Sequence, residues 1–241
     1  MKRWLLGVGL LMANLTNAHA DIITQWNFNS TTPDANTATG TTAPNIGSGT
    51  AILFGGTTAS FASGDASGGS SDPATGDDSG WNVTTFAAQG VGNLSRGVQF
   101  SVSTAGQQNI TINYDLRHSN SASRFEQFQY SIDGTNFINS ALFDGNIGDT
   151  WFNNRTVDLS SIAGVNNNAN FSFRVVAAFD TSGAYAPSNS TAAYATTGTW
   201  RFDMVTVNGV TAVPEPSSIA LLSLVGVGGF ALRRLRKGRA R

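Results

Sequence analysis

Acidic side chains crowd one stretch rich in glycine and serine, and they are the first candidates for chemistry in this sequence. They are Asp65, Asp72, Asp77 and Asp78. Carboxylate oxygens in a flexible loop suit Ca²⁺, which takes six to eight oxygen ligands. The spacing of an EF-hand loop is absent, so solvated surface acids are the alternative. We expect either no cofactor or a calcium ion in a structural role.

Residues for catalysis are sparse. Beyond residue 20 the chain has one histidine, His118, and no G-x-S-x-G nucleophile elbow. We expect His118 to be an exposed turn residue after a strand. Glycoside hydrolysis needs two carboxylates, but Glu126 is the only glutamate before residue 215, and nearby Arg124 favours a surface ion pair. Cysteine chemistry is excluded, and no nucleotide-binding motif is found. The sequence predicts a protein that is not an enzyme, with a hydrolase as the remote alternative.

Carbohydrate binding is the main rival to a purely structural role. Sugar-binding sandwiches present exposed aromatic rings beside amides and carboxylates, which match the apolar faces and hydroxyl edges of sugars. The aromatic residues expected near loops are Trp81, Trp151, Tyr185 and Tyr194. They form a candidate carbohydrate-binding platform, and rings that close the core at strand ends are the alternative.

Period-two alternation predicts the strands that would position these residues. Apolar residues alternate with polar ones over 98–102, 110–116, 128–132 and 171–177, so each segment buries one face. Asp133-Gly134 predicts a hairpin that resumes over 136–143. Shorter strands are expected at 22–28, pairing near the closing strand, and at 51–54. The closing strand, 199–208, changes parity near Asp203, which indicates a bulge or two covered faces.

The fold class that follows is all-β: an antiparallel, jelly-roll-like β-sandwich over residues 21–213, with an N-terminal signal helix and one C-terminal transmembrane helix. No sustained helical period occurs between residues 21 and 213. Residues 60–80 are expected to form a flexible loop, because their low hydrophobicity does not offset the entropy of ordering.

Charge is distributed unevenly along the 241 residues. All fifteen acidic residues lie between Asp21 and Glu215, where the chain has six arginines and no lysine. Such an acidic surface repels nucleic acid, so a nucleic-acid partner is not expected.

The first twenty residues have the order of a secretory signal peptide: a basic start, an apolar run, and small residues at Ala18 and Ala20. Cleavage before Asp21 is predicted, and a buried core helix is the alternative. The C-terminus has three ordered features: the motif Val213, Pro214, Glu215 and Pro216; an apolar run over 217–232; and a basic stop beginning Arg233, Arg234, Arg236 and Lys237. Sixteen helical residues span about 24 Å, slightly less than the bilayer core of ~30 Å. Arginine snorkelling covers that difference, and the positive-inside rule places the acidic domain outside.

This tail, residues 214–241, resembles the PEP-CTERM sorting signal. The resemblance implies an exported substrate of exosortase, a membrane protease or transpeptidase of Gram-negative bacteria. Such a chain would be anchored transiently in the inner membrane and then sorted to the cell surface or the exopolysaccharide matrix. An ordinary membrane anchor is the alternative. The phrases at 130–134 and 199–203 also resemble those of sandwich modules in secreted bacterial surface proteins. We therefore expect a non-catalytic surface or matrix protein, with a module that binds exopolysaccharide as the rival.

Overall fold

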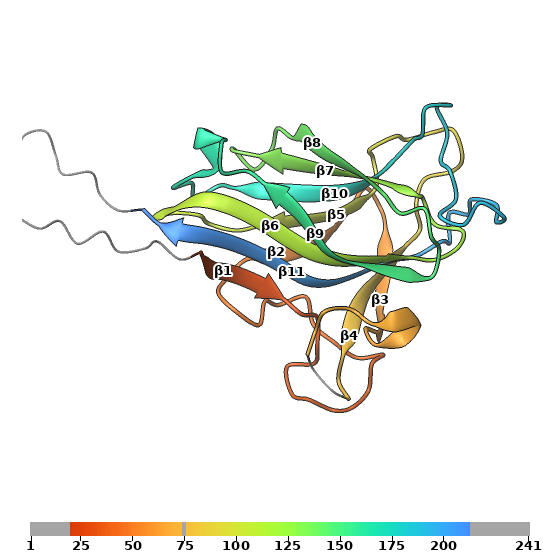
Figure 1. Cartoon of the computed structure of the whole chain (residues 1–241), viewed down its shortest axis with the longest axis horizontal. Helices are drawn as coiled ribbons and strands as arrows, with labels where there is room; N and C mark the ends of the chain where they lie inside the picture. Colours follow the sequence, from red (N-terminus) through yellow and green to blue (C-terminus); the bar gives the residue numbers. More distant parts are fainter. Residues whose placement is uncertain (1–19, 74–75, 213–241) are drawn as a thin grey trace, which may run out of the picture. The chain divides into compact units, whose positions relative to one another are not determined.

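The computed structural model describes residues 20–73 and 76–212, which form an antiparallel β-sandwich of two sheets with almost no helix (Figure 1). Its strands are β1 Asp21–Trp26, β2 Thr50–Phe54, β3 Thr58–Ser63, β4 Ser79–Thr84, β5 Gly97–Ser101, β6 Gln107–His118, β7 Phe125–Ser131, β8 Ile138–Asp144, β9 Thr150–Asp158, β10 Ser172–Ala178 and β11 Trp200–Thr211. Two short 3₁₀ turns are η1 Ala66–Gly68 and η2 Ala163–Val165.

The two sheets have interleaved strand orders. Sheet A runs β3-β4-β11-β6-β9, with β1 also paired to β11, and sheet B runs β2-β5-β10-β7-β8. Consecutive strands therefore often lie in different sheets: β4 is in sheet A, β5 in sheet B and β6 in sheet A again. The closing strand β11 pairs with β4 through its first residues, with β1 through its last ones and with β6 along its length.

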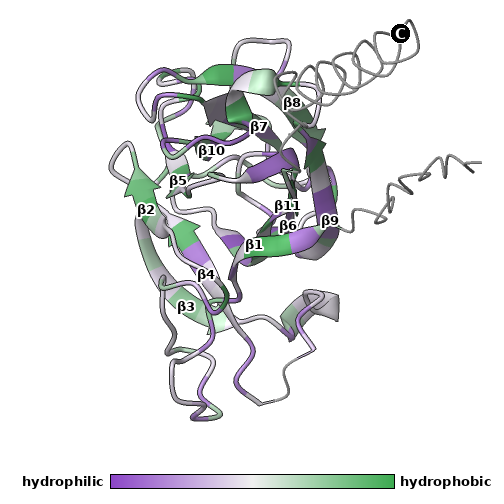
Figure 2. Ribbon diagram, turned by 90° about the vertical axis from the view of Figure 1, so that its left-hand side faces the viewer, coloured by the Kyte–Doolittle hydropathy of each residue, from purple (hydrophilic) through white to green (hydrophobic). Residues whose placement is uncertain are grey.

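The core lies between the sheets and is rich in aromatic rings. Hydrophobic and hydrophilic residues alternate along the strands (Figure 2), as strands with one buried face require. Phe100, Phe128 and Phe173 stack across β5, β7 and β10, with ring centroids 4.9 and 5.4 Å apart. Trp26 and Trp200 are fully buried from the sheet A side. The alternation in the sequence thus predicts this core correctly.

The strands expected from alternation are confirmed, and three further strands were missed. The opening strand pairs with β11 as expected, and β11 has its register shift after Asp203, where Met204 takes a positive φ of 46°. The missed strands are β3, β4 and β9. The prediction that 60–80 is a loop throughout is wrong, because β3 ends within it and β4 begins there. Phe61 is the only large apolar residue of β3, so pairing with β4 rather than its own hydrophobicity defines that strand.

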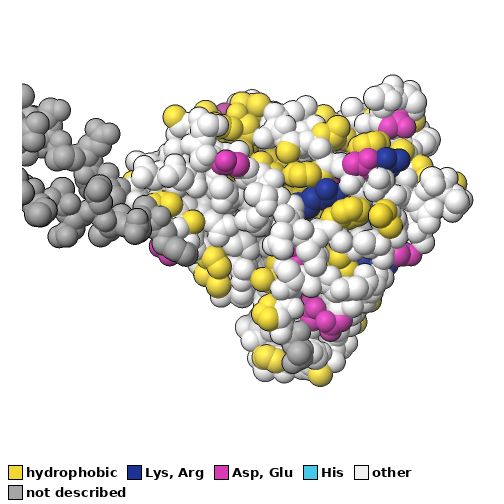
Figure 3. Space-filling model, in the orientation of Figure 1, with side chains coloured by type: hydrophobic (Ala, Val, Ile, Leu, Met, Phe, Trp, Pro, Cys, Tyr) yellow, Lys and Arg dark blue, Asp and Glu magenta, His cyan; other side chains and the backbone are white. Residues whose placement is uncertain are grey.

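Few charged side chains lie on the face shown in Figure 3. Within the described residues, no helix has both the length and the apolar character needed to cross a bilayer. The predicted signal helix through residue 19, with Ala18, and the predicted tail from Val213 to the C-terminus lie outside the described residues.

Candidate functional site

Three carboxylates from distant parts of the sequence meet beside the bulge in β11. Their ligand atoms lie within 4.8 Å of one another, and they belong to Asp72, Asp78 and Asp203. Asp72 follows η1, Asp78 directly precedes β4, and Asp203 comes from β11. The register shift after Asp203 is the local cause, since a bulge re-aims the side chains beside it.

The segment 64–72 closes over this cluster because hydrogen bonds pin it to sheet A. Trp151 donates its Nε1–H to the carbonyl oxygen of Ala66 at 2.8 Å. The carboxylate of Asp115 on β6 accepts the N–H of Ser71 at 2.5 Å and that of Asn154 at 2.7 Å. Asp115 is thereby committed to backbone groups. Hydrogen bonds thus join part of the expected loop to sheet A, and its flexibility stays a prediction.

Burial makes the cluster electrostatically unfavourable as three free anions. Both carboxylate oxygens of Asp78 and the Oδ2 atom of Asp203 are buried without a hydrogen-bond partner among the described residues. Burial, together with the charges of Asp72 and Asp65, raises the pKa of Asp78 to about 7. Burial also raises the pKa of Asp203 well above its usual range, helped by the charge of Asp78. Either protons or a cation must compensate these charges.

The donor set suits a hard divalent cation. All three candidate ligands are carboxylate oxygens, which Ca²⁺ and Mg²⁺ prefer, whereas zinc and copper sites use nitrogen or sulfur. The Oδ2 atom of Asp72 also accepts a hydrogen bond from the Nδ2 atom of Asn29 at 2.8 Å, which orients that carboxylate. The residues present fit a calcium ion.

Two of the four acids predicted from the sequence belong to this cluster. Asp72 and Asp78 do, whereas Asp65 is exposed beside η1. Asp77 is buried and lines a separate cavity of about 530 Å³ with Asn27, Asn29 and Asn45. Sequence reasoning missed Asp203. The parity change in the last strand marked its position, but gave no sign that the carboxylate meets a loop more than a hundred residues away.

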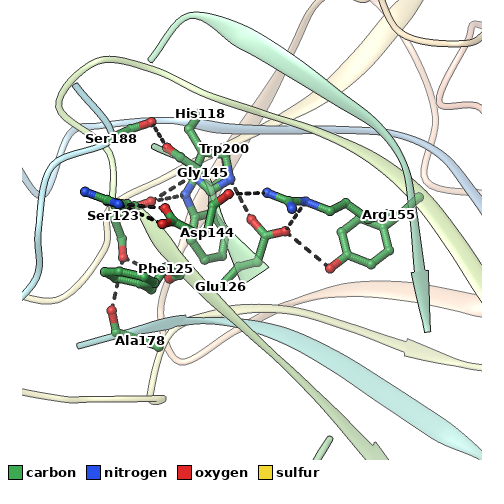
Figure 4. Close-up of polar contacts among 12 residues, drawn as sticks. His118, Ser123, Phe125, Glu126, Asp144, Gly145, Arg155, Ala178, Ser188 and Trp200 are labelled. Carbon is green, nitrogen blue, oxygen red and sulfur yellow. Dashed lines mark hydrogen bonds and ion pairs between the residues drawn. The ribbon is translucent and has the colours of Figure 1, made fainter. Parts of the chain in front are cut away.

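A second polar group, the His118 network, lies between the sheets (Figure 4). The Nδ1 atom of His118 is 2.8 Å from the carbonyl oxygen of Ser123, so it carries a proton and donates. Its Nε2 atom is 2.5 Å from Oε2 of Glu126, whose Oε1 is 3.0 Å from the Nε atom of Arg155. The hydroxyl of Tyr114 donates to the same Oε1 at 3.4 Å.

This network connects the two halves of the sandwich. His118 and Arg155 come from β6 and β9 of sheet A, and Glu126 comes from β7 of sheet B. His118 and Glu126 are fully buried. The predictions of an exposed His118 and of a surface pair between Glu126 and Arg124 are therefore wrong. Arg124 instead pairs with Asp144 at 2.6 and 2.7 Å. Because solvent and substrate cannot reach Glu126, the arrangement acts as a structural clamp.

The predicted aromatic platform is wrong for three of its four residues. Trp81, Trp151 and Tyr185 are 4, 8 and 1% exposed, so their rings offer no face to a sugar. Trp81 lies on β4 and stacks on Phe28 in the core, with centroids 5.5 Å apart. Tyr185 stacks on Tyr194, which is partly buried and donates its hydroxyl to the carbonyl oxygen of Ala87. Two of these residues lie on strands that the sequence did not reveal, which explains the error.

Polar side chains, all uncharged except Arg174, form rows across sheet B on its outer face, the side away from the core. In one row, cross-strand pairing aligns Gln99, Arg174, Gln129 and Asn139 on β5, β10, β7 and β8. A neighbouring row aligns hydroxyls of Thr50, Ser101, Ser172 and Ser131. The hydroxyl row borders a cavity of about 360 Å³, whose lining includes Thr50, Ser101, Ser172 and Asn170. Sequence reasoning did not single out this face.

The structure therefore defines a two-sheet β-sandwich, and the tail that follows it carries a sorting signal. The family model described as the PEP-CTERM protein-sorting motif matches residues 212–237. The resemblance drawn from the Pro-Glu-Pro segment and its basic stop is thus confirmed. The motif implies a secreted chain that is transiently anchored in a membrane and processed by exosortase.

Solved structures offer only distant similarity. The tandem CBM22-1–CBM22-2 domain of Xyn10C from Paenibacillus barcinonensis is 13% identical with a TM-score of 0.47, covering 85% of this chain and 49% of that one. This chain thus spans about half of the tandem. The CBM22-1 xylan-binding domain of that enzyme is 12% identical with a TM-score of 0.44, covering 82% of this chain and 100% of that one.

An adhesin domain gives a similar result. The K1 cleaved adhesin domain of Lys-gingipain from Porphyromonas gingivalis W83 is 15% identical with a TM-score of 0.33, covering 67% of this chain and 98% of that one. At these scores the ligands of these proteins say nothing about the ligand of this chain. No curated protein matches the chain with significance.

Proposed function

We propose that this chain is a non-catalytic protein of the cell surface or the exopolysaccharide matrix of a Gram-negative bacterium, delivered by exosortase. The match of the PEP-CTERM motif to residues 212–237 carries the proposal. The signal peptide of residues 1–20 exports the chain, and the apolar run and basic stop hold it at the inner membrane until the tail is removed. The domain delivered is residues 21–213, a jelly-roll-like sandwich.

A proline pair fits the role of a processing signal. Pro214 and Pro216 cannot join a helix interior and favour extended backbone around Glu215, which keeps the peptide accessible to a membrane protease. The test is mass spectrometry of the released protein from cells with and without exosortase. We expect a new C-terminus near Glu215 only when the enzyme is present. A released chain that keeps Arg233 and Arg234 in exosortase-containing cells would overturn the proposal.

The absence of catalysis is part of the same proposal. Glu126 and His118 are sealed in the core, and the cluster of Asp72, Asp78 and Asp203 is closed over by segment 64–72. We assign that cluster to a structural Ca²⁺ ion that ties the segment to β11. Release of reducing sugar from any matrix polysaccharide by the purified full chain would contradict a non-catalytic role.

Binding of exopolysaccharide is the second candidate function, and the outer face of sheet B favours it. The accessible amides of Gln99 and Asn139 and the hydroxyls of Thr50 and Ser101, beside a cavity of about 360 Å³, match the hydroxyl edges of a sugar chain. The test is a glycan array with the full chain in detergent. We expect the double variant Gln99→Ala/Asn139→Ala to lose binding, and Asn113→Ala on the opposite sheet to retain it. Equal loss in both variants, or no binding by the parent chain, would refute this role.

A further inference from the structure

Arg174 stands at the centre of the outer face of sheet B. It belongs to β10, the middle strand of the sheet, and its neighbours in sequence, Phe173 and Val175, point into the core. Its Nε–H donates to the Oε1 atom of Gln99 on β5 at 2.8 Å. That bond fixes the orientation of the guanidinium plane.

Two aromatic rings hold the guanidinium from two sides. Its Cζ atom is 3.8 Å from the ring centroid of Phe54 on β2 and 3.6 Å from that of Phe137, just before β8. Phe54 belongs to the edge strand β2, and Phe137 directly precedes the other edge strand, β8. The two rings hold the guanidinium through cation–π contacts and leave the hydrogen-bonding capacity of its Nη groups for a partner.

The free edge carries two Nη groups that no protein acceptor uses. In the described part of the chain, neither Nη group forms a hydrogen bond or an ion pair, and Arg174 is partly exposed. Burial lowers the pKa of Arg174, but an arginine remains charged at neutral pH. The Nη groups of the other described arginines donate hydrogen bonds to carbonyl or carboxylate oxygens. For example, Arg117 binds Asp149, Arg124 binds Asp144, and Arg201 binds the carbonyl oxygen of Ser63.

The surroundings of Arg174 leave its charge available. The other charged strand residue of this face is Asp144, at the end of β8, and Arg124 already neutralises it. Asp133 lies beside the cavity at the hydroxyl row, but its carboxylate accepts hydrogen bonds from Ser131, Thr135 and Asn136. A planar fork with two parallel N–H donors matches a carboxylate, which is planar and accepts both.

We propose that Arg174 binds the carboxylate of a uronic acid unit in an acidic polysaccharide, so that the outer face of sheet B prefers acidic glycans over neutral ones. The accessible members of the two rows, Gln99, Asn139, Thr50 and Ser101, bind the hydroxyl groups of the same and neighbouring sugars. The exposed parts of the two phenylalanine rings contact their apolar faces. The inference rests on the proposed carbohydrate-binding function and adds the class of sugar. Since acids outnumber arginines fifteen to six between Asp21 and Glu215, the attraction is local to this fork rather than a long-range effect.

The test compares two ligands with the same sugar backbone, one with free carboxylates and one with neutral ester groups: soluble oligogalacturonate and its methyl ester. Binding to the full chain in detergent is measured by titration calorimetry with calcium omitted, so that the ligand does not gel. We expect the acid to bind about ten-fold or more tightly than the ester, with that preference lost in Arg174→Gln. Arg174→Lys keeps the charge without the fork and should recover only part of the preference. Arg117→Gln, which removes an arginine from the opposite sheet, is the matched control and should bind like the parent chain.

The outcomes separate this inference from the function on which it rests. Equal binding of acid and ester, unchanged in Arg174→Gln, would overturn the role of Arg174 while carbohydrate binding stands. Failure to bind these or any neutral glycan would refute carbohydrate binding as a whole. Equally tight binding of dextran sulfate would show attraction to charge alone and would also overturn the inference. Thermal unfolding of each variant verifies that lost binding is not lost folding.

Discussion

Calcium at the cluster of Asp72, Asp78 and Asp203 should stabilise the fold measurably. The perturbation is removal of divalent cations with a chelator, followed by titration with CaCl₂. Three carboxylates meet within 4.8 Å, and buried oxygens of two of them have no hydrogen-bond partner among the described residues. Without a metal, burying these acids in charged or protonated form lowers the stability of the folded protein. A cation that binds only the folded chain removes that cost.

The magnitude follows from linkage. Calcium sites in extracellular modules have dissociation constants of about 10⁻⁴ to 10⁻³ M. At a calcium concentration about 100 times the dissociation constant, the folded state gains about 2.7 kcal/mol. For a domain of this size, each kcal/mol shifts the melting temperature by roughly 2–4 °C. We therefore expect saturating calcium to raise the melting temperature by about 5–10 °C.

The assay is thermal unfolding of the full chain in detergent, followed by circular dichroism, with two variants of the cluster. Asp72→Asn, at the partly exposed member, and Asp78→Asn, at a buried one, should each abolish most of the calcium shift. Asp78→Asn should also unfold at a higher temperature than the parent in chelator, because it removes a buried charge next to Asp203. Asp158→Asn changes an exposed acid at the end of β9 and should keep the full shift. A melting temperature independent of calcium in the parent chain would refute the site, as would loss of the shift in the Asp158 variant.

Three further outcomes follow from the structure. Glu126→Gln should lower the free energy of unfolding in urea by about 3–5 kcal/mol, because it disturbs the buried pairs with His118 and Arg155. Asp144→Asn, at the exposed pair with Arg124, should lower it by about 1 kcal/mol or less. Equal effects would show that the clamp is not coupled to the core. Trp151→Phe removes the donor to Ala66, so limited proteolysis should cut within 64–72 faster than in the parent, and an unchanged cleavage rate would mean that the segment is held by other contacts. Pro214→Ala/Pro216→Ala should leave the unprocessed precursor in the membrane fraction on immunoblots, while processing at the parent rate would show that the proline pair is not recognised.

The sequence predicts the strands whose own residues alternate between apolar and polar. The missed strands show why strands without this alternation are not predicted. β5, β6 and β10 place Val, Ile or Phe at every second position, so one face is visibly apolar. In β9 the polar residues Asn153, Asn154 and Arg155 interrupt the apolar pattern, and β3 has Phe61 as its one large apolar residue. These strands exist because β6 and β4 present paired backbone groups to them. Such pairing is a long-range property that a local pattern does not reveal.

The candidate sites also depend on long-range contacts that local sequence patterns do not reveal. The Gly/Ser/Asp stretch correctly marked Asp72 and Asp78, since acids clustered in a loop are a local signal. Asp203 joins them only because β11 pairs with β4, and Glu126 meets His118 only because sheet B packs on sheet A. The prediction of exposed aromatic residues failed because long-range strand pairing, which the sequence does not show, buries some of them. Trp151 reads as a loop residue until β9 is seen to pair with β6, where its ring lies under η1.

The two outer faces of the sandwich are used differently, and this asymmetry decides where a ligand can bind. Segment 64–72 lies over sheet A, and its polar groups are already bonded to Trp151 and Asp115. On sheet B, neither Nη group of Arg174 binds an acceptor among the described residues. Between Asp21 and Glu215 the chain has six arginines and no lysine. The other charged strand residue of this face, Asp144, is paired with Arg124, so the fork of Arg174 dominates recognition of an anion there. A glycan that reaches sheet B is therefore selected by hydroxyl geometry along the rows and by charge at Arg174 alone.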